Sequence, residues 1–265
     1  MAKLLEGKPL AERIKEEIRQ RVLSLKLKPI LASIQVGENA GAASYVKSQA
    51  KTAEALGIEY QLHKLGDDVH EGHLIDFIQK LDTNKSVNGI IIQMPLPAQI
   101  DYKKIRRFVR PEKDVEWMYP CTPAAVMELL KESGVDLYGK EVVIVGHSEI
   151  VGKPLALLLL DKFATVTVAH IGTSKAGKLE EHVKRAEVLI VAVGKAGLIK
   201  GEWIKEGAIV IDVGINRVED KIVGDVEFEA AEKRASYITP VPGGVGPLTV
   251  TMLMRNLVEA AKLQQ

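Results

Sequence analysis

Residues 141–160 read EVVIVGHSEIVGKPLALLLL, a pattern that predicts a strand, a turn and a helix in direct succession. The unbroken apolar run that ends at Gly146 is typical of a strand covered on both faces. Ser148 and Gly152 follow where the helix should begin, and backbone amides at such a helix start favour a pyrophosphate. The spacing departs from G-x-G-x-x-G, because Ser148 replaces the second glycine and the third falls one residue late. An ordinary turn of an α/β sheet therefore stays an alternative.

Three further apolar runs support a parallel sheet. ATVTVA spans residues 164–169, and EVLIVAVG (187–194) and AIVIDVG (208–214) both end in glycine. Such runs, separated by helical patterns, predict an α/β fold whose parallel strands are covered by helices. The crevice at the carboxyl ends of these strands is where we expect a dinucleotide.

The first half of the chain alternates in the same way. A stripe of Leu10, Ile14, Ile18 and Val22 predicts a helix, with Pro9 suited to its first turn. We expect a strand at 31–36, a helix at 42–56, short strands near Tyr60 and at 89–94, and a helix capped by Thr122. The predicted domains are 1–120 plus 247–265, and 121–246.

Residues 240–254, PVPGGVGPLTVTMLM, combine a loop and a helix. Two prolines and three glycines predict a tight turn whose amides can approach a flat ligand, although a simple domain connector is an alternative. The apolar residues that follow predict a buried helix that returns to pack on the first domain; they are Val250, Leu253, Met254, Leu257 and Ala261.

Composition excludes several classes of protein. The chain has 265 residues, 46% of them hydrophobic, and a net charge of +1, which gives no electrostatic footprint for nucleic acid or an anionic membrane. Its longest purely apolar run, 155–160, is far too short to span a membrane, and Glu6 and Lys8 interrupt any signal peptide. The lone Cys121 excludes an intramolecular disulfide, and the six histidines lack the grouping of a metal site. We expect a cytoplasmic protein without a metal.

Five stretches carry a resemblance to a known family. They are VGENAGAASYVKSQAKTAEALGI (36–58), GIIIQMPLP (89–97), PEKDV with PCTP (111–123), GHSEIVGKPLALLLL with ATVTVAH (146–170), and IDVGINR through PVPGGVGPLTV (211–250). The chain resembles the bifunctional methylenetetrahydrofolate dehydrogenase/methenyltetrahydrofolate cyclohydrolase family. The resemblance implies folate bound between a catalytic domain and a Rossmann-type domain. It also implies oxidation of 5,10-methylenetetrahydrofolate with a nicotinamide cofactor, then hydrolysis to 10-formyltetrahydrofolate, in one-carbon metabolism and purine biosynthesis.

The resemblance assigns roles to individual residues. It implies that Tyr45 stacks on the aminobenzoate ring, that Gln93 lies beside the reacting carbon, and that Glu116 binds the pterin. The loop of Pro242, Gly243, Gly244 and Gly246 would line the folate cleft. The expected cofactor-binding residues are Gly146, His147, Ser148, Gly152, Ile171, Thr173 and Ile215.

Departures from the family pattern surround the same cleft. Gln49 stands where the family has a lysine, and an amide cannot exchange a proton near neutral pH. Lys47 and Lys51 cannot replace it, since they point to the other side of the helix. KDVDG reads KDVEW here, so Glu116 lengthens the carboxylate arm and Trp117 adds bulk at the pterin end.

We expect the dehydrogenase activity to be retained and the cyclohydrolase activity to be weakened or lost. Two alternatives stay open. Both steps could survive by using water or Gln93, or the protein could be a non-catalytic folate or dinucleotide binder.

The cofactor and the oligomeric state are also predicted from the resemblance. His147 and Gly172 stand where the family has basic residues, yet no acidic residue occupies 168–170 to select NAD. His147, Ser148, Thr173 and Lys175 could form a weaker phosphate pocket. NADP is the predicted cofactor, with NAD as the alternative, and the resemblance implies a homodimer through the second domain.

Overall fold

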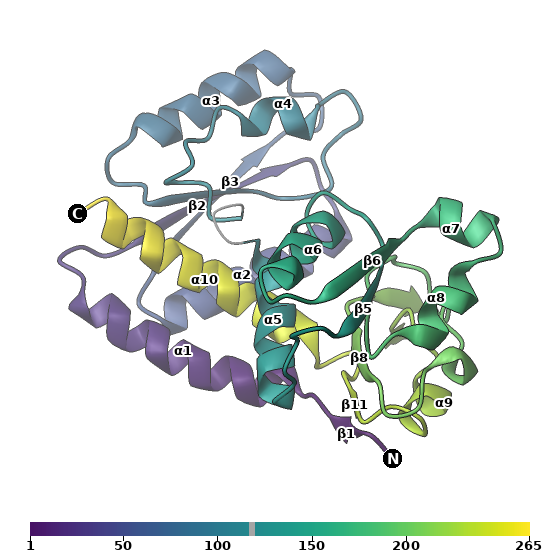
Figure 1. Ribbon diagram of the computed structural model, residues 1–265. Coiled ribbons are helices and arrows are strands. Elements are labelled where there is room, and N and C mark those ends of the chain that lie inside the picture. The colour runs from purple at the N-terminus through teal and green to yellow at the C-terminus, as the bar shows by residue number, and fades with distance from the viewer. Residues whose placement is uncertain (117–119) are drawn as a thin grey trace. The chain divides into compact units, whose positions relative to one another are not determined.

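The computed structural model describes residues 1–116 and 120–265, so Trp117, predicted to reshape the pterin pocket, lies outside the described residues. Helices and strands alternate along the chain, as expected from the sequence (Figure 1). Their bounds are β1 Lys3–Leu4, α1 Gly7–Ser24, β2 Ile30–Val36, α2 Ala40–Ala55, β3 Glu59–Leu65, α3 Glu71–Thr83, β4 Gly89–Ile92, α4 Tyr102–Arg106, α5 Cys121–Ser133, β5 Glu141–Val145, α6 Gly152–Leu160, β6 Thr165–Ala169, α7 Ile171–Lys175, α8 Leu179–Arg185, β7 Val188–Val191, the 3₁₀ helix η1 Gly201–Trp203, β8 Ile209–Asp212, β9 Asn216–Val218, β10 Lys221–Val223, α9 Phe228–Glu232, β11 Tyr237–Ile238 and α10 Val245–Leu263.

The chain divides into two compact units. Met1–Ala11 and Thr122–Thr249 form the six-stranded unit, and Glu12–Cys121 and Val250–Gln265 form the three-stranded unit. The first eleven residues join the six-stranded unit because strand β1 pairs with β11. The predicted domain boundaries, at 120/121 and 246/247, stay a prediction.

The six-stranded unit contains a fully parallel sheet in the order β1-β11-β8-β7-β5-β6. One face carries Val143, Leu189 and Val210, which pack with residues of α8 and α9 in one buried cluster. Helices α5 and α6 lie on the other side of the sheet (Figure 1). Strand β5 pairs with β6 on one side and with β7 on the other. The order in which strands are added to the sheet therefore changes direction at β5. The predicted parallel sheet is confirmed, and this reversal is where such sheets form ligand crevices.

The three-stranded unit is a smaller parallel sheet in the order β3-β2-β4. Residues of α3 and α4 pack with one face in a buried cluster around Ile34, Ile78 and Ile105. A Cβ on Gly89 of β4 would lie 2.6 Å from the Leu257 side chain of α10. The last helix therefore returns to the first half of the chain, as predicted.

Three local expectations need correction. Helix α10 begins at Val245 rather than at Val250, since its first turn tolerates Pro247, whose missing N–H would be unpaired there in any case. Helix α5 begins at Cys121, so Thr122 lies in its first turn and is not its cap. Strand β6 is an edge strand and is half-exposed, whereas its apolar run predicted burial on both faces.

The described residues contain neither a membrane-spanning helix nor a cluster of metal ligands. Within residues 1–116 and 120–265, no helix is long and apolar enough to cross a membrane. The same residues contain no group of three or more His, Cys, Asp or Glu side chains that could hold a metal ion.

Candidate functional site

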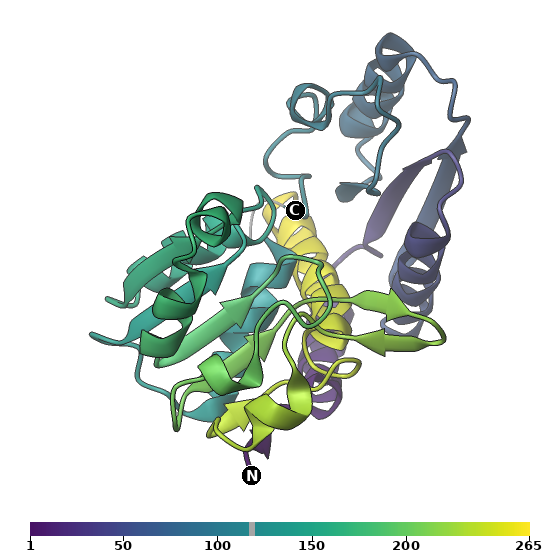
Figure 2. The same ribbon diagram turned by 90° about the vertical axis from the view of Figure 1, so that its right-hand side faces the viewer.

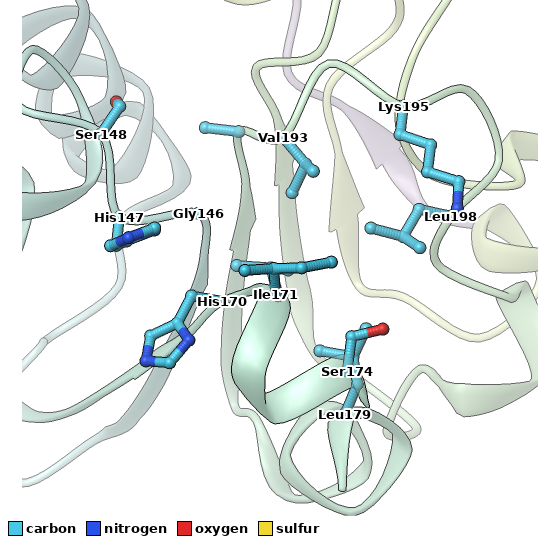
Figure 3. Close-up of a pocket in the computed structure, with 12 residues that line it drawn as sticks. Gly146, His147, Ser148, His170, Ile171, Ser174, Leu179, Val193, Lys195 and Leu198 are labelled. Atoms are coloured by element: carbon cyan, nitrogen blue, oxygen red, sulfur yellow. The ribbon is translucent and has the colours of Figure 1, made fainter. Parts of the chain in front are cut away.

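A cavity of about 320 Å³ opens at the carboxyl ends of β5, β6 and β7 (Figure 3). The loops that follow the three strands line the cavity, which lies where the strand order changes direction at β5. Most of the lining is apolar, with His, Ser and Lys side chains around it. The lining residues are Val145, Gly146, His147, Ser148, His170, Ile171, Ser174, Leu179, Ala192, Val193, Lys195 and Leu198.

Two glycines allow the backbone to close around this cavity. Gly146 has φ 119°, and a Cβ there would lie 2.2 Å from the Ala192 carbonyl oxygen. A Cβ on Gly152 would lie 2.1 Å from the Gly146 carbonyl oxygen, so only glycine lets α6 begin directly against the end of β5. The Ser148 hydroxyl accepts a hydrogen bond from the Val151 N–H at 3.1 Å. The Ser148 carbonyl oxygen also accepts the Lys153 N–H at 3.1 Å, so the turn is closed by its own hydrogen bonds, and the positive end of the α6 dipole at this wall of the cavity favours phosphate oxygens.

One end of the cavity carries two imidazoles. The rings of His147 and His170 lie 5.0 Å apart, opposite Lys195 and Leu198 (Figure 3). His170 Nδ1 accepts the Gly172 N–H at 3.1 Å, so the neutral ring carries its proton on Nε2 and can donate there. Of the described residues, none that lines the cavity is Asp or Glu. The polar groups therefore favour an anionic ligand group.

The predicted cofactor residues fall into two groups. Gly146, His147, Ser148 and Ile171 line the cavity. The other three are not among the lining residues. Gly152 is the first residue of α6, and Ile215 is exposed on the loop after β8. Thr173 Oγ1 accepts the His170 N–H at 3.2 Å. Their role in binding stays a prediction.

Several lining residues were not predicted as binding residues. Ser174 lines the cavity where Lys175 was considered, and the turn after β7 adds Val193, Lys195 and Leu198. Only the glycine that ends the β7 run, in EVLIVAVG, signalled that this turn approaches the crevice.

A buried amide cluster lies in the three-stranded unit. The Gln49 Oε1 atom accepts hydrogen bonds from the Tyr60 hydroxyl at 3.0 Å and from Gln93 Nε2 at 2.7 Å. Gln93 Nε2 also donates to Ser33 Oγ at 3.0 Å. Gln49 and Gln93 are 4% and 6% exposed. The cluster joins α2, β2, β3 and the end of β4, and it brings the predicted residues Gln49 and Gln93 into direct contact.

Tyr45 lies one turn before Gln49 on α2 and is partly exposed, so its ring is accessible for stacking. Lys47 lines a separate hollow of about 630 Å³ together with Val46, Ala50 and Tyr60. As predicted, Lys47 therefore lies on a helix face other than that of Tyr45 and Gln49.

Glu116 lies at the end of a carboxylate-rich segment in the three-stranded unit. Burial, assisted by the neighbouring Asp114 carboxylate and opposed by Arg106, raises the pKa of Glu116 to about 7. Arg106 Nε donates to Asp114 Oδ2 at 2.8 Å, so the arginine charge is already paired with Asp114. Glu116 can thus exchange a proton near neutral pH.

The glycine loop before α10 belongs to the six-stranded unit. Gly243 has φ 112°, and its carbonyl oxygen accepts the Gly7 N–H at 2.8 Å. A Cβ on Gly7 would lie 1.8 Å from the Gly244 carbonyl oxygen, so the start of α1 packs directly on the loop. The predicted turn is present between β11 and α10 and contains Pro242, Gly243 and Gly244, whereas Gly246 lies in the first turn of α10. The role of these four residues in substrate binding stays a prediction.

Comparison with known proteins assigns both parts of the chain to one family. Residues 5–116 match the tetrahydrofolate dehydrogenase/cyclohydrolase catalytic domain, and residues 120–265 match the NAD(P)-binding domain of the same family. The chain belongs to the tetrahydrofolate dehydrogenase/cyclohydrolase family. The resemblance inferred from the sequence motifs is therefore confirmed, and the cavity lies within the NAD(P)-binding domain.

Relatives in the tetrahydrofolate dehydrogenase/cyclohydrolase family match over their full length. The bifunctional protein FolD of Acetivibrio thermocellus is 49% identical over an alignment of 282 positions. The alignment covers 99% of this chain and 98% of that protein. The crystal structure of the FolD methylenetetrahydrofolate dehydrogenase/cyclohydrolase from Campylobacter jejuni is 42% identical, with a TM-score of 0.96 and complete coverage of both chains. The Trypanosoma brucei enzyme, complexed with NADP and an inhibitor, is 37% identical, with a TM-score of 0.95 and coverage of 99% of this chain and 98% of that one.

Proposed function

We propose that the protein oxidises 5,10-methylenetetrahydrofolate to the 5,10-methenyl cation with NADP, and then hydrolyses that cation to 10-formyltetrahydrofolate. The observation that carries the proposal is the match of both domains to one family, together with a cavity at the reversal point of the NAD(P)-binding sheet. The Campylobacter jejuni relative, which matches over its whole length, bears the names of these two activities.

The residues present fit a dinucleotide. Gly146 and Gly152 let the end of β5 and the start of α6 pack closely beside the cavity, the arrangement with which such folds hold a pyrophosphate, and apolar side chains such as Ile171 and Leu198 suit a flat ring. The bound dinucleotide supplies the hydride acceptor. The protein contributes orientation, and correct positioning can account for most of the acceleration of a hydride transfer.

We propose NADP as the preferred cofactor, with NAD as the alternative. Two imidazoles and Lys195 border the cavity, and no Asp or Glu among its described lining residues would hold the two ribose hydroxyls that mark NAD. Cationic side chains instead favour the additional phosphate of NADP. The paired His147 and His170 rings, which can donate hydrogen bonds, and the lack of a carboxylate among the described lining residues therefore support the phosphate-bearing cofactor.

In the three-stranded unit, we propose that Tyr45, Gln49, Gln93 and Glu116 form the substrate-binding and catalytic group. Gln93 is held by Ser33 and Gln49, so its amide has a fixed orientation. Glu116 offers a carboxylate that can accept paired N–H groups of a pterin ring when it is ionised.

A second candidate function is a dehydrogenase with little cyclohydrolase activity. Hydrolysis needs a group that moves a proton, whereas Gln49 is a neutral amide whose oxygen already accepts two hydrogen bonds. This arrangement favours the first step over the second, because hydride transfer depends mainly on orientation.

The deciding experiment follows purified protein with 5,10-methylenetetrahydrofolate, separately with NADP and with NAD, and records reduced cofactor, methenyl product and 10-formyl product. Accumulation of methenyl product would show a dehydrogenase with impaired hydrolysis. Prompt formation of the 10-formyl product would show both activities. Stabilisation by ligands without any reduced cofactor would contradict the proposal and indicate a non-catalytic binder.

We also propose a homodimer that forms through α6 and β6. Strand β6 is the edge of the six-stranded sheet, and Leu157 and Phe163 beside it are 65% and 72% exposed. Phe163 contacts the exposed Tyr138, with ring centroids 5.7 Å apart. Exposed apolar side chains beside an open sheet edge favour pairing with a second copy. We further assign the reactions to the cytoplasm and to the supply of one-carbon units for purine biosynthesis.

A further inference from the structure

A buried carboxylate organises the edge of the cofactor cavity. Asp225 has no solvent exposure, and it follows the hairpin formed by β9 and β10 (Figure 2). Its Oδ2 atom accepts the N–H groups of Val193 at 2.7 Å and Gly194 at 2.9 Å. Its Oδ1 atom accepts the Lys195 N–H at 2.7 Å and the Asn216 Nδ2 group at 2.8 Å. One side chain thus holds two loops that are about twenty residues apart in sequence.

Both loops belong to the region proposed to bind the cofactor. Val193 and Lys195 line the cavity after β7. Asn216, the first residue of β9, directly follows Ile215 of the loop after β8. Three successive backbone N–H groups that converge on one point form a concavity that binds anions. Here the carboxylate of Asp225 occupies that concavity, so the turn after β7 is held from behind while its side chains face the cavity.

Asp225 is itself held in place. The Asp212 carboxylate, at the end of β8, accepts the N–H of Asp225 at 3.1 Å and that of Val226 at 2.9 Å. A Cβ on Gly214 would lie within 2.4 Å of the Asp225 carboxylate, so the loop after β8 passes directly over it. Neither loop can move away from Asp225 without breaking charge-assisted hydrogen bonds in a buried site.

We propose that Asp225 is a positioning residue, which fixes the turn of Val193–Lys195 and the loop of Ile215 in the conformation that binds the dinucleotide. This inference rests on the proposed function, in which the cavity takes NADP. The ligand contacts Asp225 only through these loops. Loss of the carboxylate should therefore weaken cofactor binding without changing Tyr45, Gln49 and Gln93, which belong to the three-stranded unit.

The test compares Asp225→Asn with Asp220→Asn, the same substitution on a fully exposed side chain of the same hairpin. In Asp225→Asn an NH₂ group must face backbone or side-chain N–H donors, because both carboxylate oxygens accept. The dissociation constant for NADP, measured by calorimetry, and KM for NADP should rise about 10- to 100-fold, as for other small misplacements of binding groups. KM for the folate substrate should stay within about twofold, and kcat at saturating NADP within about threefold. Asp220→Asn should behave as wild type.

A general loss of structure would lower kcat and alter both KM values together. A rise in KM for NADP with an unchanged KM for folate therefore identifies a positioning role for Asp225. If Asp225→Asn does not fold, Asn216→Ala decides, since it removes one hydrogen bond to Asp225 and leaves the carboxylate. We expect a rise of about 3- to 10-fold in its NADP dissociation constant. Wild-type affinity for NADP in a folded Asp225→Asn, or in Asn216→Ala where that variant decides, would overturn the inference. Failure of the wild-type protein itself to bind NADP would instead overturn the proposed function.

Discussion

Gln49 determines whether the amide cluster can transfer a proton. Its side chain accepts from Tyr60 and Gln93 and carries no titratable group. In Gln49→Lys, the new ammonium would be buried, which lowers the pKa of a lysine and makes proton exchange near pH 7 possible. Because a positioned acid–base group contributes about 10²–10⁴-fold, we expect conversion of methenyl to 10-formyl product to rise at least about tenfold. The measurement is the decay of methenyl product under steady-state conditions.

The matched control is Ser48→Lys, which adds the same charge to α2 at the exposed neighbouring position. This variant should leave both rates near those of wild type. Equal hydrolysis by Gln49→Lys and wild-type protein would show that this position does not limit the second step. Fast hydrolysis by the wild-type protein would show the same.

Glu116 predicts a pH dependence of folate binding. Desolvation, assisted by Asp114, raises the pKa of Glu116 to about 7, above its ordinary value of 4.5. The ionised fraction therefore falls from about one half at pH 7 to about one tenth at pH 6, and the protonated carboxyl can no longer accept two N–H groups. We expect KM for the folate substrate to rise as pH falls through 7, and Glu116→Gln to remove this dependence while keeping KM high. Steady-state kinetics between about pH 5.5 and 8.5 provide the measurement.

Glu112→Gln provides the control, since Glu112 lies four residues earlier with a half-exposed carboxylate. It should keep the wild-type profile. An unchanged profile in Glu116→Gln would assign the pH dependence to another group and remove Glu116 from the binding site.

At the scale of elements, the junction of β5 and α6 depends on a close backbone approach. In Gly152→Ala the new methyl group would collide with the Gly146 carbonyl, only 2.1 Å away, so α6 must shift. Overpacking of this kind costs about 1–3 kcal/mol in the free energy of unfolding, and the shift should also weaken NADP binding at least about tenfold. Gly72→Ala is the control, because Gly72 also lies in the first turn of a helix but has open space around it. Denaturant unfolding and calorimetry would measure the two effects, and equal stability of the two variants would contradict the steric argument.

The elements were predictable where the chemistry is local. Apolar runs such as residues 141–145 and 209–212 show burial on both faces, and the i, i+4 stripe of α1 marks its core side. The contacts of Asp225 were not predictable, because they join residues 9 to 32 positions apart through three backbone N–H groups and one side-chain amide that no motif displays. The start of α10 was misplaced because glycine and proline at 246–247 read as a loop, although the first turn of a helix accepts both.

At the scale of the whole molecule, the proposed chemistry is divided between the two units. The cavity, Asp225 and the glycine loop belong to the six-stranded unit, whereas Tyr45, Gln49, Gln93 and Glu116 belong to the three-stranded unit. The chain passes between the units within α1, at residues 121–122 and within α10. Substitutions in the cofactor cavity should therefore act on KM for NADP, and those in the amide cluster on the folate steps, whereas substitutions in the glycine loop of the six-stranded unit should act on KM for folate.

Assembly of two copies is the remaining prediction. Leu157 is on the outer face of α6, beside the open edge of β6. In Leu157→Arg, a charged group would have to be buried without a partner if this face pairs with a second copy, a cost of several kcal/mol. We expect light scattering after size-exclusion chromatography to show a dimer for wild type and a monomer for Leu157→Arg. The control Leu23→Arg, at an equally exposed leucine of α1, should remain dimeric. A monomeric wild-type protein, or a dimeric Leu157→Arg, would show that α6 and β6 do not form the interface, since unpaired burial of an arginine is too costly for a stable dimer to accommodate.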